Sequence, residues 1–375
     1  MSGKIVASLP FPLPPLAEQH RIVAKVDELM ALCDQLEAVK TEREQSRDRL
    51  VAASLHRLNF PADTAETEAT GLPPRQADAF RDPARFVFSH LPQLTTRPGH
   101  IKQLRQTILN LAVRGKLVPQ DPNDEPAGVL HQRLIAEVES YAIQCAIAPP
   151  RFDSFAGDTL PFAAPTGWVW VRLASLFKVI TDGAHQPPPK SASGVAFLTI
   201  GNVTTGRLDF SQCRFVPKDY FDSIAPYRRP TKGDILYTVV GATYGRPALV
   251  ETDRAFCVQR HIGVLKPTGE VELKYLRILL ASPLVYQQAT QSLTGTAQPT
   301  IPLRPLRNFV VPLPPFTEQH RIVAKADELM ALCDQLEAQL TAAEADSRGL
   351  LEAVLYEALH PPVAATGHMT LEANE

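Results

Sequence analysis

Three short stretches contain residue types that are used in catalysis, and each lacks part of its motif. Leu313-Pro314-Pro315-Phe316 has the shape of an amino-methyltransferase motif, but that motif needs Asn, Asp or Ser where Leu313 stands. Glu272-Leu273-Lys274 matches the end of a metal-dependent nuclease motif, yet it opens an amphipathic helical pattern without an obvious Asp partner on a strand. His20 and His320 have no companion at metal-ligand spacing. Walker A, HExxH and Gly-rich cofactor signatures are absent from the sequence. We therefore expect a chain that is not an enzyme alone, with no cofactor and no metal.

Polar and basic loops between residues 181 and 300 suit a different chemistry, the reading of DNA. Gln pairs with adenine and Arg with guanine through two hydrogen bonds each, and Lys reaches phosphate. The loops are TDGAHQPPPK (181–190), YRRPTKGD (227–234), VVGATYGRP (239–247), VQRH (258–261) and LTGTAQPT (293–300). From them we predict these DNA-contacting residues: His185, Gln186, Lys190, Arg228, Arg229, Lys232, Thr243, Tyr244, Arg246, Gln259, Arg260 and Gln298. The alternatives are a plain surface loop at 181–190, ordinary hairpin glycines at Gly241 and Gly245, and a structural turn at 293–300.

The charge distribution separates the region of these loops from the rest of the chain. Residues 161–310 contain 17 Lys and Arg against 9 Asp and Glu, a net charge of +8. The whole chain has a net charge of -2, so the remainder has -10. A basic domain joined to acidic segments indicates a polyanion partner for one part and protein partners for the other. A chance excess of surface cations is the alternative interpretation.

The elements that must position this basic region include a helix that occurs twice. PLPPLAEQHRIVAKVDELMALCDQLEA (12–38) and PLPPFTEQHRIVAKADELMALCDQLEA (312–338) differ only at 16/316, 17/317 and 26/326. Paired prolines block a helix before residues 17 and 317. Apolar residues then follow the 4-3-4-3 spacing of a coiled-coil seam. The predicted spacer-helix seam comprises Ile22, Val26, Leu29, Cys33, Leu36, Ile322, Ala326, Leu329, Cys333 and Leu336. We expect two helices of about 63 Å that pair antiparallel.

The segments between the two copies predict a mixed fold. Helical patterns cover 100–117 and 128–143, and short strand-like runs with turn residues between them begin at Trp168. One helical pattern, over 273–289, interrupts these strands. The expected product is an α+β protein, with one globular α/β domain and two long helices that form an antiparallel coiled-coil spacer.

Cysteine usage and hydropathy bear on the compartment. The five cysteines are odd in number and scattered, which favours reduced thiols over a disulfide framework. No apolar run reaches the ~18 residues of a membrane span, and no signal-like segment opens the sequence. We expect a cytoplasmic protein without a membrane partner.

Four segments, in this order, resemble the DNA specificity subunit of type I restriction–modification systems. They are PLPPLAEQHRI, LRQTILNLAVRGKLVPQDPNDEPA, LPFAAPTGWVWVRL with TDGAHQPP, and GTAQPTIPLRPLRNFVVPLPPFTEQHRI, and the resemblance covers nearly the whole chain. It implies a non-catalytic subunit whose target-recognition domain reads half of a bipartite site in double-stranded DNA. It also implies conserved helices that act as a ruler and dock methyltransferase (modification) subunits. A restriction/translocase subunit would join through that complex.

The chain departs from this family pattern by having two conserved helices and one recognition domain. MSGKIVASLPFPLPPLAEQ aligns with IPLRPLRNFVVPLPPFTEQ, so we expect residues 1–16 to be the remnant of a preceding recognition domain. The further expected segments are helix 17–58, an irregular linker 59–98, a helical connector 99–149, the recognition domain 150–315, helix 316–360 and a flexible tail 361–375. Pairing of the helices within one chain and a homodimer both remain open. A free-standing DNA-binding or decoy half-subunit, which modulates the complex without supporting methylation, is the alternative function.

Overall fold

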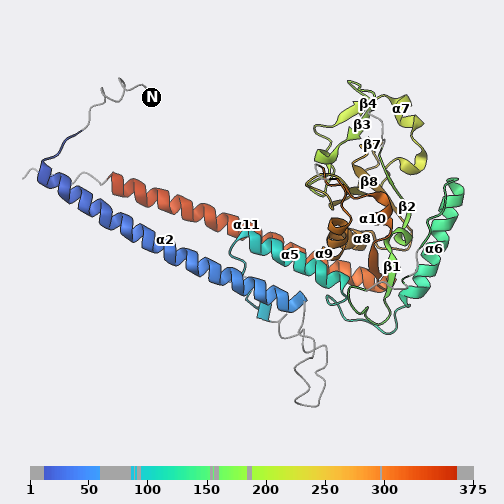
Figure 1. Cartoon of the computed structure of the whole chain (residues 1–375), viewed down its shortest axis with the longest axis horizontal. Coiled ribbons are helices and arrows are strands. Elements are labelled where there is room, and N and C mark those ends of the chain that lie inside the picture. The colour runs from blue at the N-terminus through green and yellow to red at the C-terminus, as the bar shows by residue number, and fades with distance from the viewer. Residues whose placement is uncertain are drawn as a thin grey trace, which may run out of the picture. The chain divides into compact units, whose positions relative to one another are not determined.

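The computed structural model describes residues 12–59, 86–87, 89–90, 94–152, 155, 160–183, 188–295 and 298–360. The chain divides into two compact units, Met1–Thr95 and Thr96–Glu375, whose elements are labelled in Figure 1. Among the described residues, no helix combines the length and hydrophobicity needed to cross a membrane.

The first unit is dominated by one helix, α2 (Leu16–Asn59). It begins directly after Pro14-Pro15, with Glu18 in its first turn and His56 and Arg57 in its last turn. These charges complement the helix dipole at both ends. Residues 16–43 are exposed apart from the half-buried Gln19. The buried residues of α2 lie near its C-terminal end, and they are Val51, Ser54, Leu55 and Leu58.

The second unit combines helices with three antiparallel or mixed sheets. Its helices are α5 (Pro98–Val113), α6 (Ala127–Gln144), α7 (Lys218–Ser223), α8 (Leu273–Ala281), α9 (Pro283–Gln291), α10 (Leu303–Arg307) and α11 (Phe316–Leu359). Short 3-10 helices are η2 (Leu173–Leu176), η3 (Ile200–Asn202) and η4 (Pro226–Arg228). The strands are β1 (Val169–Arg172), β2 (Phe177–Asp182), β3 (Val195–Leu198), β4 (Arg214–Val216), β5 (Ile235–Thr238), β6 (Pro247–Leu249), β7 (Phe256–Val258), β8 (Ile262–Pro267) and β9 (Val310–Leu313). The predicted mixed helix-and-sheet class is therefore confirmed.

The sheets have a simple order. The largest runs β2-β8-β5-β6 and is antiparallel throughout. A three-stranded sheet runs β4-β3-β7, with β3 antiparallel to β4 and parallel to β7. A core cluster contains residues of both sheets, among them Leu198 and Phe256 from one and Leu236 and Val264 from the other. The two sheets thus pack on each other through this apolar core, which holds in place the loops at the ends of their strands.

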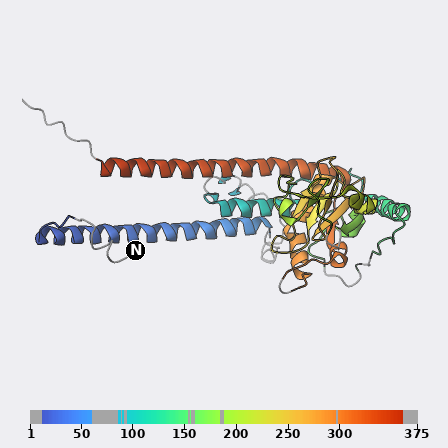
Figure 2. The same ribbon diagram turned by 90° about the horizontal axis from the view of Figure 1, so that it is seen from above.

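Strands β1 and β9 close this globular part on itself. They pair antiparallel, with Val169 opposite Leu313 and Arg172 opposite Val310. The start and the end of the domain are therefore neighbours, and β9 leads through Pro314-Pro315 directly into α11. Helix α11 packs against α5 and α8, and Figure 2 shows α5 alongside the first half of α11.

Candidate nucleic-acid interface

Four of the polar loops meet at one end of the four-stranded sheet. Because neighbouring strands are antiparallel, the end of β2, the start of β8, the end of β5 and the start of β6 lie together. Backbone hydrogen bonds link the loops that follow. Gly183 N donates to Ile262 O (3.3 Å), Val239 N to His261 O (3.1 Å) and Gly241 N to Pro299 O (2.9 Å). We call residues 183, 239–246, 259–261, 293–295 and 298–300 the loop cluster.

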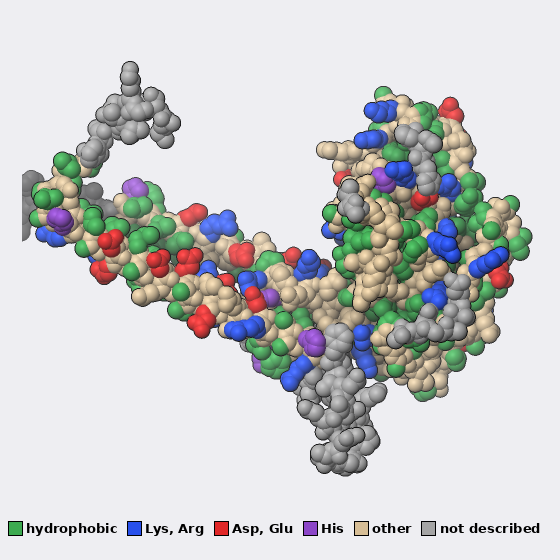
Figure 3. All heavy atoms as spheres, in the orientation of Figure 1, with side chains coloured by type: hydrophobic (Ala, Val, Ile, Leu, Met, Phe, Trp, Pro, Cys, Tyr) green, Lys and Arg blue, Asp and Glu red, His purple; other side chains and the backbone are tan. Residues whose placement is uncertain are grey.

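The loop cluster has a one-sided charge. Its described residues contain no Asp or Glu, whereas Arg246 and Arg260 are exposed there. Lys190 is also exposed, and the residue after it, Ser191, pairs with Phe215 of β4. Arg246 Nη1 donates to Thr204 O (2.9 Å), and Arg260 Nε lies 3.2 Å from His261 Nε2. Figure 3 shows Lys and Arg side chains distributed over the globular part of this unit. The adjoining carboxylate of Asp182 is paired with Arg228, so the exposed charge of the loop cluster is positive and attracts a polyanion.

An aromatic pair joins helix α9 to the loop cluster. The rings of Tyr244 and Tyr286 stack with centroids 5.3 Å apart and an interplanar angle of 4°. Tyr244 Oη lies 2.9 Å from Thr290 Oγ1. Gly245 lies next to the Tyr286 ring and has a φ of +82°. A Cβ at this position would lie 3.2 Å from Tyr286 Cδ2, a tight contact. Tyr286 is 49% exposed. The sequence interpretation missed Tyr286, although its i, i+4 spacing to Thr290 on a helix was a usable signal.

Arg228 and Arg229 are held by acceptors of the protein itself. Arg228 Nη2 donates to Asp182 O (3.1 Å), Asp182 Oδ1 (3.0 Å) and Gly183 O (3.0 Å). Arg229 donates to Ile224 O (2.7 Å) and Asp222 O (2.6 Å), and its guanidinium lies 4.9 Å from the Phe221 ring centroid. Arg228 thereby fixes the chain where β2 enters the loop cluster.

The remaining predicted contacts are unevenly placed. Thr243, Tyr244 and Gln259 are half-buried in the loop cluster, and Gln298 is exposed there. Lys232 precedes β5, at the opposite end of the sheet, and pairs with Asp253 (3.1 Å). The structure therefore does not bring Lys232 together with the others. His185 and Gln186 lie outside the described residues.

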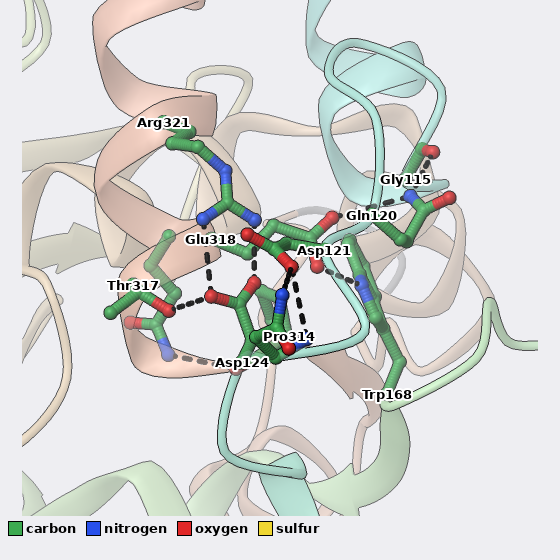
Figure 4. A network of polar contacts seen from close by, with 11 residues as sticks. Gly115, Gln120, Asp121, Asp124, Trp168, Pro314, Thr317, Glu318 and Arg321 are labelled. Atoms are coloured by element: carbon green, nitrogen blue, oxygen red, sulfur yellow. Dashed lines mark hydrogen bonds and ion pairs between the residues drawn. The ribbon is translucent and has the colours of Figure 1, made fainter.

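A second polar site lies where α11 begins, and Figure 4 shows its side chains. The buried carboxylate of Glu318 accepts hydrogen bonds from Trp168 Nε1 (2.9 Å) and Gln120 Nε2 (3.2 Å). Desolvation by burial raises the pKa of Glu318. Asp124 accepts from Arg321 Nη2 (2.5 Å) and from Thr317 Oγ1, and the Arg321 hydrogen bond lowers the pKa of Asp124. We call Gln120, Asp124, Trp168, Thr317, Glu318 and Arg321 the helix-start network.

The predicted seam residues fall into two environments. Ile322, Ala326, Leu329, Cys333 and Leu336 are buried, and they lie on α11, which packs against α5 and α8 within the second unit. Arg105 of α5 pairs with Asp334 (2.6 Å) and Glu337 (2.9 Å) at the edge of this contact. Ile22, Val26, Leu29, Cys33 and Leu36 are exposed. The sequence interpretation did not identify α5 as a partner of α11.

The described residues offer little for metal chemistry. Among them, no group of three or more His, Cys, Asp and Glu side chains is placed to hold a metal ion. The loop cluster and α9 present hydrogen-bond donors, cations and aromatic rings.

The part of the chain that contains the loop cluster is similar to a known domain. Residues 165–343 match the type I restriction modification DNA specificity domain. The type I restriction enzyme EcoAI specificity subunit of Escherichia coli is 29% identical over 360 residues, covering 94% of this chain and 58% of that protein. The EcoEI specificity subunit of Escherichia coli is 28% identical over 362 residues, with 94% and 58% coverage. The chain thus spans less than two thirds of these relatives.

A solved structure, the HsdS subunit of Thermoanaerobacter tengcongensis, aligns with 82% of this chain and 68% of its own. The two are 22% identical, with a TM-score of 0.39. The family resemblance predicted from the four sequence segments is confirmed by the domain match and the curated relatives.

Proposed function

We propose that the loop cluster, which lies within residues 165–343 that match the type I restriction modification DNA specificity domain, reads one half-site of a bipartite DNA sequence. The observation that carries this proposal is the meeting of four polar loops at one end of the β2-β8-β5-β6 sheet. The described residues of the loop cluster include the exposed Arg246 and Arg260 and no carboxylate, and the adjoining Asp182 is paired with Arg228.

The residues have different roles in this proposal. Lys190, Arg246 and Arg260 contact phosphate or guanine, because their side chains are exposed. Gln259 and Gln298 present amides suited to adenine. Tyr244 and Tyr286 form a rigid aromatic wall beside them. Arg228 and Arg229 position the loops, since their donors already have protein acceptors. His185 and Gln186 remain predicted contacts, and Lys232 is a phosphate contact outside the loop cluster.

Titration with duplex DNA at several salt concentrations tests this assignment. Arg246→Ala and Arg260→Ala are compared with Arg254→Ala, which removes another exposed Arg near Asp253, away from the loop cluster. A phosphate contact lowers the slope of log K against log salt by about one, for every sequence alike. A bidentate contact to a base costs ~1–3 kcal/mol and relaxes the preference at one position. Unchanged affinity and slope in both loop variants contradict the proposal.

We also propose that the chain works inside a type I complex. Methyltransferase subunits dock on α2, α11 and α5, and a restriction/translocase subunit joins through that complex. Helix α11 contains nine Asp and Glu against three Lys and Arg, and α2 exposes apolar side chains such as Ile22 and Leu29. Loss of methyltransferase capture in variants of these helices, with DNA binding retained, tests this docking. The same proposal includes an antiparallel spacer formed by the two long helices. It also includes the segment boundaries predicted from the sequence. Direct seam-to-seam pairing over residues 322–336 competes with α5, because those side chains are already buried on α5 and α8.

The second candidate function is a decoy half-subunit, which binds DNA without supporting methylation. Co-expression with a type I methyltransferase, followed by methylome sequencing, separates the two. Methylation at a palindromic bipartite motif indicates a dimer, methylation at a lone half-site a monomer, and no methylation the decoy.

A further inference from the structure

Helix α9 of the second unit exposes a face that contains no charged residue. From 278 to 303 the sequence has no Asp, Glu, Lys, Arg or His. Exposed faces of helices usually consist of charged and polar residues, so a face without any charge requires a reason. At 3.6 residues per turn, the exposed side chains of α9 span about 140° of its circumference. We call these residues, Tyr286, Gln287, Thr290 and Gln291, the α9 face.

The α9 face adjoins the loop cluster through its aromatic residue. Tyr286 stacks on Tyr244, and Thr290 Oγ1 lies 2.9 Å from Tyr244 Oη. The chain that leaves α9 then enters the loop cluster, where Thr294 and Thr300 exchange two backbone hydrogen bonds of 2.9 Å. A duplex bound on the loop cluster therefore has the α9 face beside it.

The junction between α9 and the loop cluster is packed from below. Tyr237 of β5 is fully buried, and a Cβ at Gly245 would lie 3.6 Å from its Oη atom. The buried Thr238 fixes the same hairpin, since its Oγ1 donates to Thr243 O (2.6 Å) and accepts from Arg246 N (3.0 Å). Aromatic side chains on such a fixed support lose little conformational entropy when they bind a partner.

The hydrogen bonds of α9 decide which groups its face can offer. Gln288 is committed to the protein, because its Nε2 donates to Val310 O (2.9 Å) and its Oε1 accepts from Val310 N (2.8 Å). Thr290 Oγ1 donates to Tyr286 O (2.8 Å), so Thr290 has its methyl group left for a contact. The amides of Gln287 and Gln291 are exposed, one helical turn apart. The α9 face thus offers two amides, a methyl group and an aromatic ring, but no cation.

We propose that the α9 face reads A·T base pairs of the half-site, with the amides of Gln287 and Gln291 bound to adenine and with Tyr286 and Thr290 against a thymine methyl group. Amides suit the N6 and N7 atoms of adenine, and apolar groups suit the thymine methyl. The inference rests on the proposed reading of DNA by the loop cluster. It divides the work between two elements, because the cations of the loops supply electrostatic affinity and α9 supplies sequence preference.

Selection from a pool of duplexes with a randomised segment, followed by sequencing, tests the amides in the full chain. Wild type should enrich a motif that contains A·T pairs. The double variant Gln287→Ala, Gln291→Ala should lower the preference at such pairs by about tenfold. Its salt dependence should equal that of wild type, because no cation is removed. Alanine favours the helix, so α9 should keep its structure. Gln335→Ala, Gln339→Ala is the matched control, since it removes two exposed amides with the same spacing from α11.

A methyl deletion in the DNA tests the apolar part of the face. Uracil in place of thymine in the enriched motif should weaken binding to wild type several-fold. Tyr286→Ala should also weaken binding, and the two changes together should cost less than their separate effects combined, because both remove one contact. Tyr286→Phe retains the ring and should respond to uracil as wild type does.

The outcomes distinguish the α9 face from the loop cluster. A motif that survives unchanged in the Gln287→Ala, Gln291→Ala variant overturns the inference alone, and this result is also expected if α9 binds a protein instead. Equal loss of affinity for every sequence overturns it too, because base reading would then be absent. Independent effects of uracil and Tyr286→Ala contradict the thymine contact. If wild type enriches no motif, the proposal for the loop cluster fails, and the inference for α9 fails with it.

Discussion

The two repeat helices have the same local structure and different surroundings. Gln19 Nε2 donates to Pro14 O (2.8 Å), and Gln319 Nε2 donates to Pro314 O (3.0 Å) in the same way. Yet the front half of α11 is buried and that of α2 is exposed. The local sequence thus decides where a helix starts and which residues share a face. Tertiary packing decides how much each residue contributes to the free energy of unfolding.

The two helices should differ most in the stability effect of substituting an apolar residue that is buried in one copy only. Ile322→Ala should lower the free energy of unfolding by ~2–5 kcal/mol, because it leaves a cavity beneath α5 and α8. Ile22→Ala should change it by less than ~0.5 kcal/mol, since Ile22 is exposed. Denaturant unfolding followed by tryptophan fluorescence measures this, because the two tryptophans of the chain, Trp168 and Trp170, lie in the second unit. Equal effects of the two substitutions would refute the difference in packing.

A smaller difference is expected at the helix-start network. Glu318→Ala should cost ~1–3 kcal/mol, because the Trp168 indole and the Gln120 amide lose their acceptor in a buried site. Glu318→Gln retains an acceptor oxygen and should cost less. Glu18→Ala, the matched control, removes an exposed carboxylate and should be nearly neutral. The same fluorescence-detected unfolding compares all three, and a Glu318→Ala variant as stable as the control speaks against the network.

The pH dependence of this network should show two opposite signs. The pKa of Glu318 is raised above its ordinary 4.5, so the folded chain holds that proton longer. The free energy of unfolding therefore falls as pH rises from 4.5 to the folded pKa, by about 1.4 kcal/mol per pH unit between the two values. The pKa of Asp124 is lowered below 3.8, so its contribution is present above that pH and is lost as pH falls through the folded pKa.

Comparison of variants across pH 2 to 8 separates the two carboxyls. The stability of wild type relative to Glu318→Gln should decline as pH rises above 4.5, whereas its stability relative to Asp124→Asn should increase as pH rises toward 3.8. Unfolding midpoints in urea at each pH supply the measurement. Parallel curves for wild type and Glu318→Gln would mean that Glu318 titrates as an ordinary exposed carboxyl.

Much of the fold follows from local sequence signals. The paired prolines place the starts of α2 and α11, and the apolar spacing predicts helices where α5 and α6 lie. An apolar stripe of Ile, Leu and Cys does not specify its packing partner, however. The same residues at Ile22 and Ile322 are compatible with a copy, with α5 or with another protein, and only packing selects among them.

The candidate site was less predictable, because it depends on strand pairing. Residue types indicated the loops as the site. The β2-β8-β5-β6 strand order, however, decides that Arg246 and Arg260 lie at the same end of the sheet and Lys232 at the opposite end. The use of Arg228 to hold Asp182 and Gly183 requires long-range contacts that no local pattern encodes. Tyr286 was overlooked because it lies on a helix rather than in a loop.

The smallest expected effect concerns an ion pair within each helix, whose strength should not depend on tertiary packing. Lys25 and Glu28 pair at 2.9 Å in α2, and Lys325 and Glu328 pair at 2.8 Å in α11. Both pairs are exposed and lie within one helix, so each should contribute ~0.2–0.5 kcal/mol, and equally. Glu28→Gln and Glu328→Gln should therefore raise the amide exchange of their own turns to the same small extent. Mass spectrometry resolves the copies through peptides that contain Val26 or Ala326, which differ in mass. A response several-fold larger in α11 would show that packing on α5 and α8 changes even exposed pairs, and the separation of local from tertiary effects would fail at this position.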